Sequence, residues 1–202
     1  MKIIDGLKLK GRPAEIPDCG RASLPQFFKD MKFKVGAEIG VEYGFFSEEL
    51  CKAGMKVYAI DPWLKYGDYR NNRVPQDKMD SWYECAVNRL KPYDCVILRK
   101  KSMDATEDIP DESLDFVYID GNHDFKHVAE DIVEWSKKVR KGGVISGHDY
   151  IHIERTFDNV HVKWVVDAYT QAFKIRNWYL LGRKEKIEGE VRDKQRSWMW
   201  IK

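Results

Sequence analysis

The chain reads Val35-Gly36-Ala37-Glu38-Ile39-Gly40-Val41-Glu42-Tyr43-Gly44 from residue 35 to residue 44. Apolar residues 35–39 predict a buried β-strand, and residues 47–53 predict a helix that Gly54 ends. Between them, Gly40 and Gly44 have no β-carbon, so the backbone can turn sharply and a ligand can lie against it. By itself this unit is a weak indication of a binding site, because an ordinary turn with a solvated glutamate explains it as well.

The glycine spacing and the charge of this turn indicate which ligand it suits. A dinucleotide-binding turn has glycines at i, i+2 and i+5, whereas Glu42 and Phe45 stand at the two later positions after Gly40. Glu42 would also repel a pyrophosphate at the start of the helix. The ammonium and sulfonium groups of S-adenosylmethionine are positively charged, so Glu38 and Glu42 would each favour that cofactor instead.

The composition favours one soluble domain. With 202 residues and a net charge of +2, the chain can build one sheet-and-helix core, and its positive residues are not gathered into a nucleic-acid-binding arm. No apolar run approaches the ~18 residues of a membrane span, and the first residues lack the apolar stretch of a signal peptide. We expect a cytoplasmic protein with a single domain, 1–202, and neither a membrane nor a nucleic-acid partner.

Apolar strands and amphipathic helices alternate along residues 35–202, which form the expected α/β core. Residues 1–34 are expected to form an extended arm and a short helix capped by Ser23. We expect strands at 35–39, 57–60, 95–98, 114–119, 144–147, 177–181 and 197–201, and helices at 47–53, 77–90, 125–139 and 161–173, the third ended by Lys141-Gly142-Gly143. This order predicts a Rossmann-like three-layer α/β sandwich, with a mostly parallel seven-stranded sheet and one antiparallel edge strand.

Polar residues follow the second strand at the edge where such sheets bind ligands. Asp61 lies about twenty residues beyond the glycine turn, where a carboxylate can accept hydrogen bonds from ribose hydroxyls. Because it precedes Pro62, it could instead simply initiate a turn. Loop 64–76 is longer than a plain connection requires. Four residues of this loop are candidates for contacting an acceptor substrate: Tyr66, Tyr69, Arg70 and Arg73. The alternative is a solvated loop without that role.

Four stretches together resemble one known group of enzymes. They are residues 37–44, Ile60-Asp61-Pro62-Trp63, Phe116-Val117-Tyr118-Ile119-Asp120-Gly121-Asn122-His123 and Gly142-Gly143-Val144-Ile145-Ser146-Gly147-His148-Asp149-Tyr150. They are similar to class I S-adenosylmethionine-dependent methyltransferases. The last two are most similar to the methyltransferase type 24 domain family, which is related to the macrocin and catechol O-methyltransferases. The resemblance covers about residues 35–150, with the motifs in the expected order.

The resemblance implies where the cofactor would bind. Glu38, Gly40 and Gly44 would shape the pocket for its amino-acid end, Asp61 would hold the ribose, and Met103 and Asp104 would lie beside the adenine. Glu42 belongs to this cofactor-binding set as well. It stands near the place of the family's middle glycine, which this chain lacks, so the form of the turn stays open. Asp120, at the end of the fourth strand, would contact the cofactor and also take part in the reaction.

The resemblance also places the chemistry at the ends of the fourth and fifth strands. Asp120, His148 and Asp149 could converge on Mg²⁺ or another divalent cation, although relatives generally have two acidic residues where this chain has His148-Asp149. A turn that needs no ion is the alternative. With Asp120, His123 is the expected catalytic residue, as general base, because the ordinary pKa of histidine lies near neutrality; otherwise it caps the next helix. His152 and His161 have no assigned role.

The expected function is O-methylation of a small polar molecule, such as a sugar or a natural product, with S-adenosylmethionine as cofactor and a divalent cation as a potential aid. A non-catalytic cofactor-binding module is one alternative, and a nucleotide-sugar or NAD-dependent enzyme on the same kind of sheet is another. The residues leave the acceptor open. They also leave the oligomeric state open, with a homodimer as one arrangement they allow.

Overall fold

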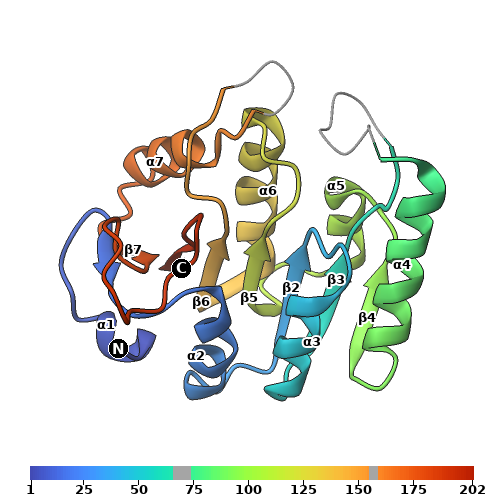
Figure 1. Ribbon diagram of the computed structural model, residues 1–202, viewed down its shortest axis with the longest axis horizontal. Coiled ribbons are helices and arrows are strands. Elements are labelled where there is room, and N and C mark those ends of the chain that lie inside the picture. Colours follow the sequence, from blue (N-terminus) through green and yellow to red (C-terminus); the bar gives the residue numbers. More distant parts are fainter. Residues whose placement is uncertain (66–73, 155–158) are drawn as a thin grey trace.

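Eight strands form one sheet in the computed structural model, which describes residues 1–65, 74–154 and 159–202. In spatial order they are β1 (Ala14–Ile16), β7 (Trp178–Leu181), β8 (Trp198–Ile201), β6 (Val139–Gly147), β5 (Leu114–Ile119), β2 (Val35–Ile39), β3 (Lys56–Ile60) and β4 (Cys95–Leu98) (Figure 1). Strands β6, β5, β2, β3 and β4 pair in parallel, because crossovers return the chain to the same edge each time. The predicted Rossmann-like α/β class is confirmed.

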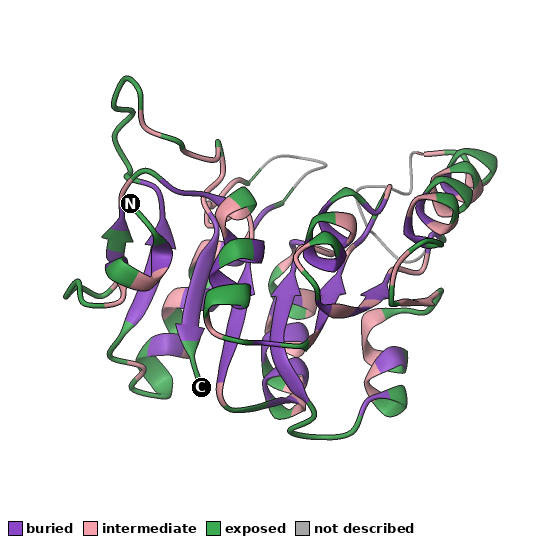
Figure 2. Ribbon diagram, turned by 90° about the horizontal axis from the view of Figure 1, so that it is seen from below, coloured by how far each residue is buried: buried purple, intermediate pink, exposed green. Residues whose placement is uncertain are grey.

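Helices cover both faces of this sheet, as a three-layer sandwich requires (Figure 2). One face carries α1 (Ile3–Gly6), α2 (Leu24–Asp30), α3 (Phe45–Lys52) and α4 (Gln76–Leu90), and the other carries α5 (Ser102–Ala105), α6 (Phe125–Lys138) and α7 (Val162–Ala172). Every residue of β5 is buried, because apolar side chains from both layers pack against it. In the part of the chain that the structure describes, no helix is long and apolar enough to cross a membrane.

The amino-terminal arm differs from its prediction. Residues 14–16 form β1, which pairs in parallel with β7 and makes an eighth strand at the sheet's edge. Ile16 is fully buried, so the arm contributes to the core. The helix at Leu24–Asp30 is present with Pro25 in its first turn, but the Ser23 side chain does not cap it. The Ser23 hydroxyl instead accepts a hydrogen bond from the backbone N–H of Gly20 at 3.3 Å.

The position of the antiparallel strand in the sheet and the boundary between α6 and β6 also differ from the expected ones. The antiparallel strand, β8, lies between β6 and β7 rather than at the outermost position, although β7 and β8 are antiparallel to one another as expected. Helix α6 ends at Lys138, and the chain enters β6 directly at Val139, so Lys141-Gly142-Gly143 lies within a strand. The register against β5 shifts between Leu114 and Phe116, and Gly142 there has a φ of +78°.

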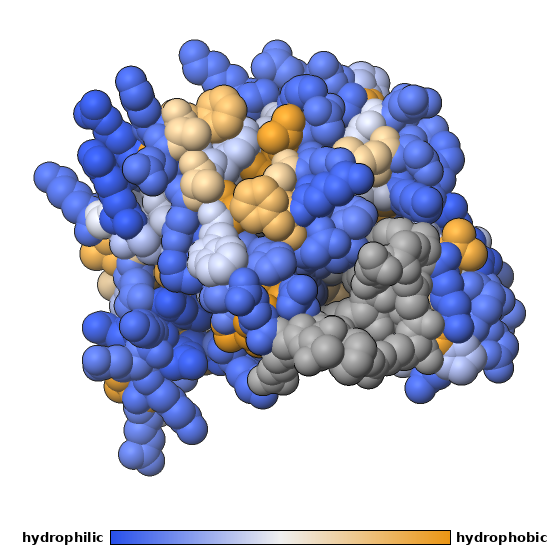
Figure 3. All heavy atoms as spheres, turned by 90° about the horizontal axis from the view of Figure 1, so that it is seen from above, coloured by the Kyte–Doolittle hydropathy of each residue, from blue (hydrophilic) through white to orange (hydrophobic). Residues whose placement is uncertain are grey.

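The carboxyl ends of the parallel strands meet along one edge, and hydrogen bonds fix their order. The backbone N–H of Gly40 donates to Ile60 at 2.9 Å, that of Asp120 to Ile39 at 2.7 Å, and that of His148 to Ile119 at 3.0 Å. The residues that follow four different strands therefore lie in one row. Figure 3 looks down on the molecule from this side, where hydrophilic side chains dominate the visible surface.

Candidate active site

The turn after β2 is held by the carboxylate of Asp61. Its Oδ2 accepts hydrogen bonds from the backbone N–H groups of Val41 at 2.9 Å and Glu42 at 3.1 Å, and its Oδ1 accepts one from Trp63 at 2.9 Å. The Trp63 indole then donates to the carbonyl of Glu42 at 2.8 Å. Burial raises the pKa of Asp61, and these three hydrogen bonds oppose that rise. Asp61 thus joins the ends of β2 and β3 and also initiates the turn that precedes Trp63.

Only glycine fits at position 40 of this turn, because a side chain there would clash with its neighbours. Its φ is +88°, and a β-carbon added there would lie 2.2 Å from the carbonyl oxygen of Asp120. Gly44 has a different place: it precedes the first residue of α3 with a φ of +77°, and an added β-carbon would meet Leu90 at 3.2 Å. Gly44 therefore starts a helix and packs against α4, whereas Gly40 lies where the two strand ends meet.

Glu38 is a buried carboxyl group at the end of β2, with 2% of its surface exposed. The hydroxyl of Ser47, in the first turn of α3, donates to its Oε2. Burial raises the pKa of Glu38 to about 8; the hydrogen bond from Ser47 and the charge of Arg21 oppose this rise, while Asp120 and Asp61 add to it. A positive charge placed beside Glu38 would favour its ionised form.

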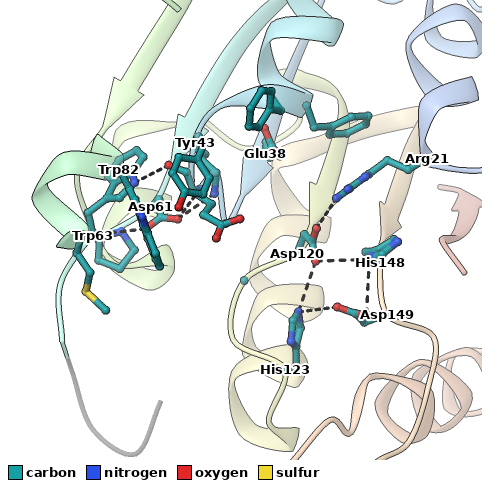
Figure 4. A pocket seen from close by; sticks show the side chains of 18 of the residues that line it. Arg21, Glu38, Tyr43, Asp61, Trp63, Trp82, Asp120, His123, His148 and Asp149 are labelled. Atoms are coloured by element: carbon teal, nitrogen blue, oxygen red, sulfur yellow. Dashed lines mark hydrogen bonds and ion pairs between the residues drawn. The ribbon is translucent and has the colours of Figure 1, made fainter. Parts of the chain in front are cut away.

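Two aspartates and two histidines converge at the ends of β5 and β6 (Figure 4). His123 Nε2 lies 3.4 Å from Asp120 Oδ1 and 3.1 Å from Asp149 Oδ2. Neither ring nitrogen of His123 has a well-angled hydrogen-bond partner among the described residues, although only 7% of the side chain is exposed. One ligand atom each from Asp120, His123 and Asp149 lies within 4.8 Å of the others.

His148 borders this group rather than completing its centre. Its Nδ1 lies 3.6 Å from Asp149 Oδ1 and 3.9 Å from Asp120 Oδ1. Burial lowers the pKa of His148, but the adjacent Asp149 and Asp120 outweigh it, so the pKa is raised overall. The predicted set Asp120, His148 and Asp149 is therefore brought together, and His123 lies among the same carboxylates.

Arg21 is a site residue that sequence reasoning missed. Its Nη1 lies 2.8 Å from Asp120 Oδ2, and its backbone N–H donates to Asp193 Oδ2 at 2.5 Å. The guanidinium also lies over the ring of Phe46, 5.7 Å from its centroid. Figure 4 shows Arg21 reaching from the amino-terminal arm toward Asp120. No local motif in the expected amino-terminal arm identified Arg21.

These side chains surround a cavity of about 390 Å³. From the predicted set it is lined by Glu38, Gly40, Glu42, Asp61, Asp120, His123, His148 and Asp149. The wall also includes Arg21 and the aromatic residues Tyr43, Phe45, Phe46, Trp63 and Trp82. Met103 and Asp104 line an adjoining cavity of about 220 Å³ that shares Gly40 and Asp61. Tyr66, Tyr69, Arg70 and Arg73 lie outside the described residues.

The lining has the chemistry of a site for a positively charged ligand. The described lining residues of the larger cavity include five carboxyl groups (Glu38, Glu42, Asp61, Asp120 and Asp149) and one guanidinium, that of Arg21. Gly40 and Asp61 line both cavities, so a ligand that extends from one cavity to the other would lie against the turn after β2. The residues therefore fit S-adenosylmethionine, and the oxygen and nitrogen atoms around His123 fit a divalent cation.

Comparison with known proteins assigns the chain to a family. A model of the type 24 family, described as a methyltransferase domain, matches residues 35–150. The chain belongs to this methyltransferase domain family, and its fold is that of class I, S-adenosylmethionine-dependent methyltransferases. A curated relative from Sinorhizobium fredii, the uncharacterized protein y4gI, is 28% identical over 124 residues. That match includes 55% of this chain but only 12% of the relative's length.

Solved structures share the fold at low sequence identity. The O-methyltransferase from Bacillus cereus, in complex with S-adenosylhomocysteine, has a TM-score of 0.62 and 13% identity, covering 90% of this chain and 80% of the other. An rRNA methylase from Streptococcus thermophilus has a TM-score of 0.60 and 12% identity, covering 89% and 93%. The O-methyltransferase TomG from Streptomyces achromogenes, in complex with S-adenosylmethionine, has a TM-score of 0.59 and 12% identity, covering 90% and 78%.

Proposed function

We propose that the protein methylates a hydroxyl oxygen of a small polar molecule, a sugar or a natural product, with S-adenosylmethionine as methyl donor. The observation that carries this proposal is the group of Asp120, His123 and Asp149 at one end of the acidic cavity. It places a nitrogen base and carboxylates beside the turn suited to a cationic cofactor. S-adenosylmethionine supplies an activated methyl group on its sulfonium, so the protein's task is alignment and proton removal.

The two cavities divide the cofactor's parts between them. Glu38 and Glu42 would face the positively charged amino-acid end, and Asp61, which lines both cavities, would lie at the ribose. Asp61 has three lone-pair directions occupied by backbone N–H groups, so a fourth remains for a hydroxyl. Met103 and Asp104 would contact the adenine in the smaller cavity.

His123 is the group we assign to remove the acceptor proton. Its Nε2 lies 3.4 Å from Asp120 and 3.1 Å from Asp149, and these carboxylates would stabilise the imidazolium that forms. Aromatic residues offer a stacking surface for a sugar or aromatic ring: Tyr43 and Trp82 lie 5.3 Å apart between ring centroids, and Phe45 is 60% exposed.

The same residues can also hold a divalent cation. Asp120, Asp149 and the imidazole of His148, as the motif suggests, would provide mixed oxygen and nitrogen ligands and leave His123 as the base. The distances also favour His123 as the ligand, and in that arrangement its lone pair could not accept the acceptor proton. When bound there, such a cation lowers the pKa of a coordinated hydroxyl. Mixed ligands admit manganese, iron or zinc as well as magnesium.

The proposal is tested by the release of S-adenosylhomocysteine. The protein is incubated with S-adenosylmethionine and a panel of polyhydroxylated acceptors, with EDTA or with added Mg²⁺, Mn²⁺ or Zn²⁺. We expect acceptor-dependent release that Asp149→Ala removes. Loss of release in EDTA and recovery with one cation would support the metal role, whereas full activity in EDTA would refute it. Product analysis that located the methyl group on nitrogen or carbon would contradict O-methylation.

A further inference from the structure

Three side chains of the types that ligate metal ions lie together outside the cavity, on the segment between β6 and α7. Ile153 and Val160 form an antiparallel bridge in which each backbone N–H donates to the other residue's carbonyl, at 2.9 and 2.8 Å. The two side chains pack toward the core. Since side chains alternate along a strand, the flanking residues His152, Glu154 and His161 share the outer face. One ligand atom from each lies within 4.8 Å of the others.

The ring of His152 is held in place by an indole. Trp164 stacks on it with centroids 3.6 Å apart and an interplanar angle of 21°. His152 Nε2 lies 3.5 Å from Glu154 Oε1, yet this nitrogen is buried and has no well-angled hydrogen-bond partner among the described residues. A buried polar atom left in this way costs free energy that a bound ligand would recover. A ring already fixed by stacking also loses little further freedom on binding.

His161 offers the third ligand at a small cost. Its Nδ1 accepts a hydrogen bond from the backbone N–H of Phe125 at 3.1 Å. A neutral imidazole has one nitrogen lone pair, so whichever nitrogen bound a cation, this hydrogen bond would be lost. Phe125 is the first residue of α6 and is exposed, and an N–H in that position has no acceptor within its helix. Water can therefore take over the hydrogen bond.

We propose that His152, Glu154 and His161 bind a divalent transition-metal ion, with zinc as the best-suited probe. Two imidazoles and one carboxylate are a ligand set that zinc takes, with a water molecule in the fourth position. Two nitrogens among the three ligands disfavour magnesium and calcium, which prefer oxygen. Glu154 has 61% of its side chain exposed, so it is free to close on the ion.

The ion would stabilise a segment that contacts the candidate active site. The backbone N–H of His161 donates to the carbonyl of His123 at 2.8 Å, and His161 immediately precedes α7. A cation here would therefore connect the segment that follows β6 to the start of α7. That connection lies next to the backbone of His123, the residue assigned as base. Its ligands are distinct from those in the cavity, so it would act on His123 only through the backbone.

Isothermal titration with ZnCl₂ tests this site in protein without a purification tag. The cavity group is removed first by the double substitution Asp120→Asn and Asp149→Asn. In that background we expect one zinc ion per chain, and at least about tenfold weaker binding after Glu154→Gln. Glu107→Gln, another exposed glutamate, is the matched control and should leave the affinity unchanged.

Fluorescence provides a second measurement in the otherwise unsubstituted protein. Bound Co²⁺ or Ni²⁺ should quench the emission of Trp164, and Trp164→Phe or Glu154→Gln should remove that saturable quenching. The proposal is overturned if the double variant binds no zinc, or if Glu154→Gln binds it as tightly as Glu107→Gln. Binding that survives in both Glu154→Gln and His161→Ala would assign the ion to other groups, such as the exposed thiol of Cys85.

Discussion

Asp120 connects three parts of the candidate active site through its two carboxylate oxygens. Oδ2 lies 2.8 Å from Arg21 Nη1, while Oδ1 faces His123 at 3.4 Å and His148 at 3.9 Å. The family resemblance predicted Asp120, His148 and Asp149 together, at the ends of the fourth and fifth strands. Arg21 could not be predicted, because its place depends on how an irregular arm folds back over the sheet.

His123 gives the clearest prediction for a single residue. His123→Asn should lower the rate of methyl transfer by about 10²- to 10⁴-fold, the usual loss when a general base is removed. The affinity for S-adenosylmethionine should change little, since the asparagine keeps a polar group of similar reach. The measurement is S-adenosylhomocysteine release with an accepted substrate. His127→Asn, in the first turn of α6, is the control, measured at saturating S-adenosylmethionine because His127 lines the smaller cavity, and equal rates for the two variants would exclude His123 as the base.

Glu38 predicts a pH dependence of stability. The folded protein holds the Glu38 proton up to a pKa of about 8, whereas an unfolded chain releases it near the ordinary value of 4.5. The folded state therefore binds more protons between these values, and the free energy of unfolding should fall as pH rises through this window. Relative to Glu38→Gln, the loss should be on the order of 2 to 4 kcal/mol.

Urea unfolding of both proteins between pH 5 and pH 8 measures this difference. Glu38→Gln is a suitable reference because glutamine has nearly the same shape and can still accept the hydrogen bond from Ser47. A constant difference between the two proteins across that range would show that Glu38 stays ionised in the folded state.

At the scale of the elements, local patterns predicted the strands and helices well. Strands β2, β4 and β5 have the expected bounds, because each is a short apolar run between polar residues. Strand β1 was missed, since three residues between Pro13 and Pro17 carry no periodicity and their pairing with β7 spans most of the chain. The α6 to β6 boundary was placed too late, because Val139 suits a helix face and a strand equally.

The turn after β2 can be tested with two matched glycines. Gly40 and Gly54 both have positive φ, +88° and +95°, but an added β-carbon meets the Asp120 carbonyl at 2.2 Å in the first case and nothing within 4 Å in the second. Gly54→Ala should therefore cost only backbone strain, roughly 1 kcal/mol. Gly40→Ala must also displace a strand end, so we expect a loss roughly 2 kcal/mol larger.

Thermal or urea unfolding gives the two stabilities, and titration with S-adenosylhomocysteine gives the affinities. Gly54→Ala should bind like the unsubstituted protein, whereas Gly40→Ala should bind much more weakly. Equal effects of the two substitutions on stability and binding would mean that the β2 turn does not shape the ligand site.

At the scale of the whole molecule, the sheet brings residues 40, 61, 120 and 148 into one row although more than a hundred residues separate the first from the last. The alternation of strands and helices was enough to predict this row. It could not predict that Asp61 would bond three backbone N–H groups, because a carboxylate at a strand end suits a ribose and a turn alike.

The most direct test of the central claim is isothermal titration with S-adenosylhomocysteine. Because Asp61 holds the turn and lines both cavities, Asp61→Ala should weaken binding by roughly tenfold or more, at about 1.4 kcal/mol per tenfold. Asp149→Ala, at the far end of the larger cavity, should bind nearly as the unsubstituted protein does. No binding by the unsubstituted protein at millimolar concentrations, or binding of NADH in its place, would contradict the claim.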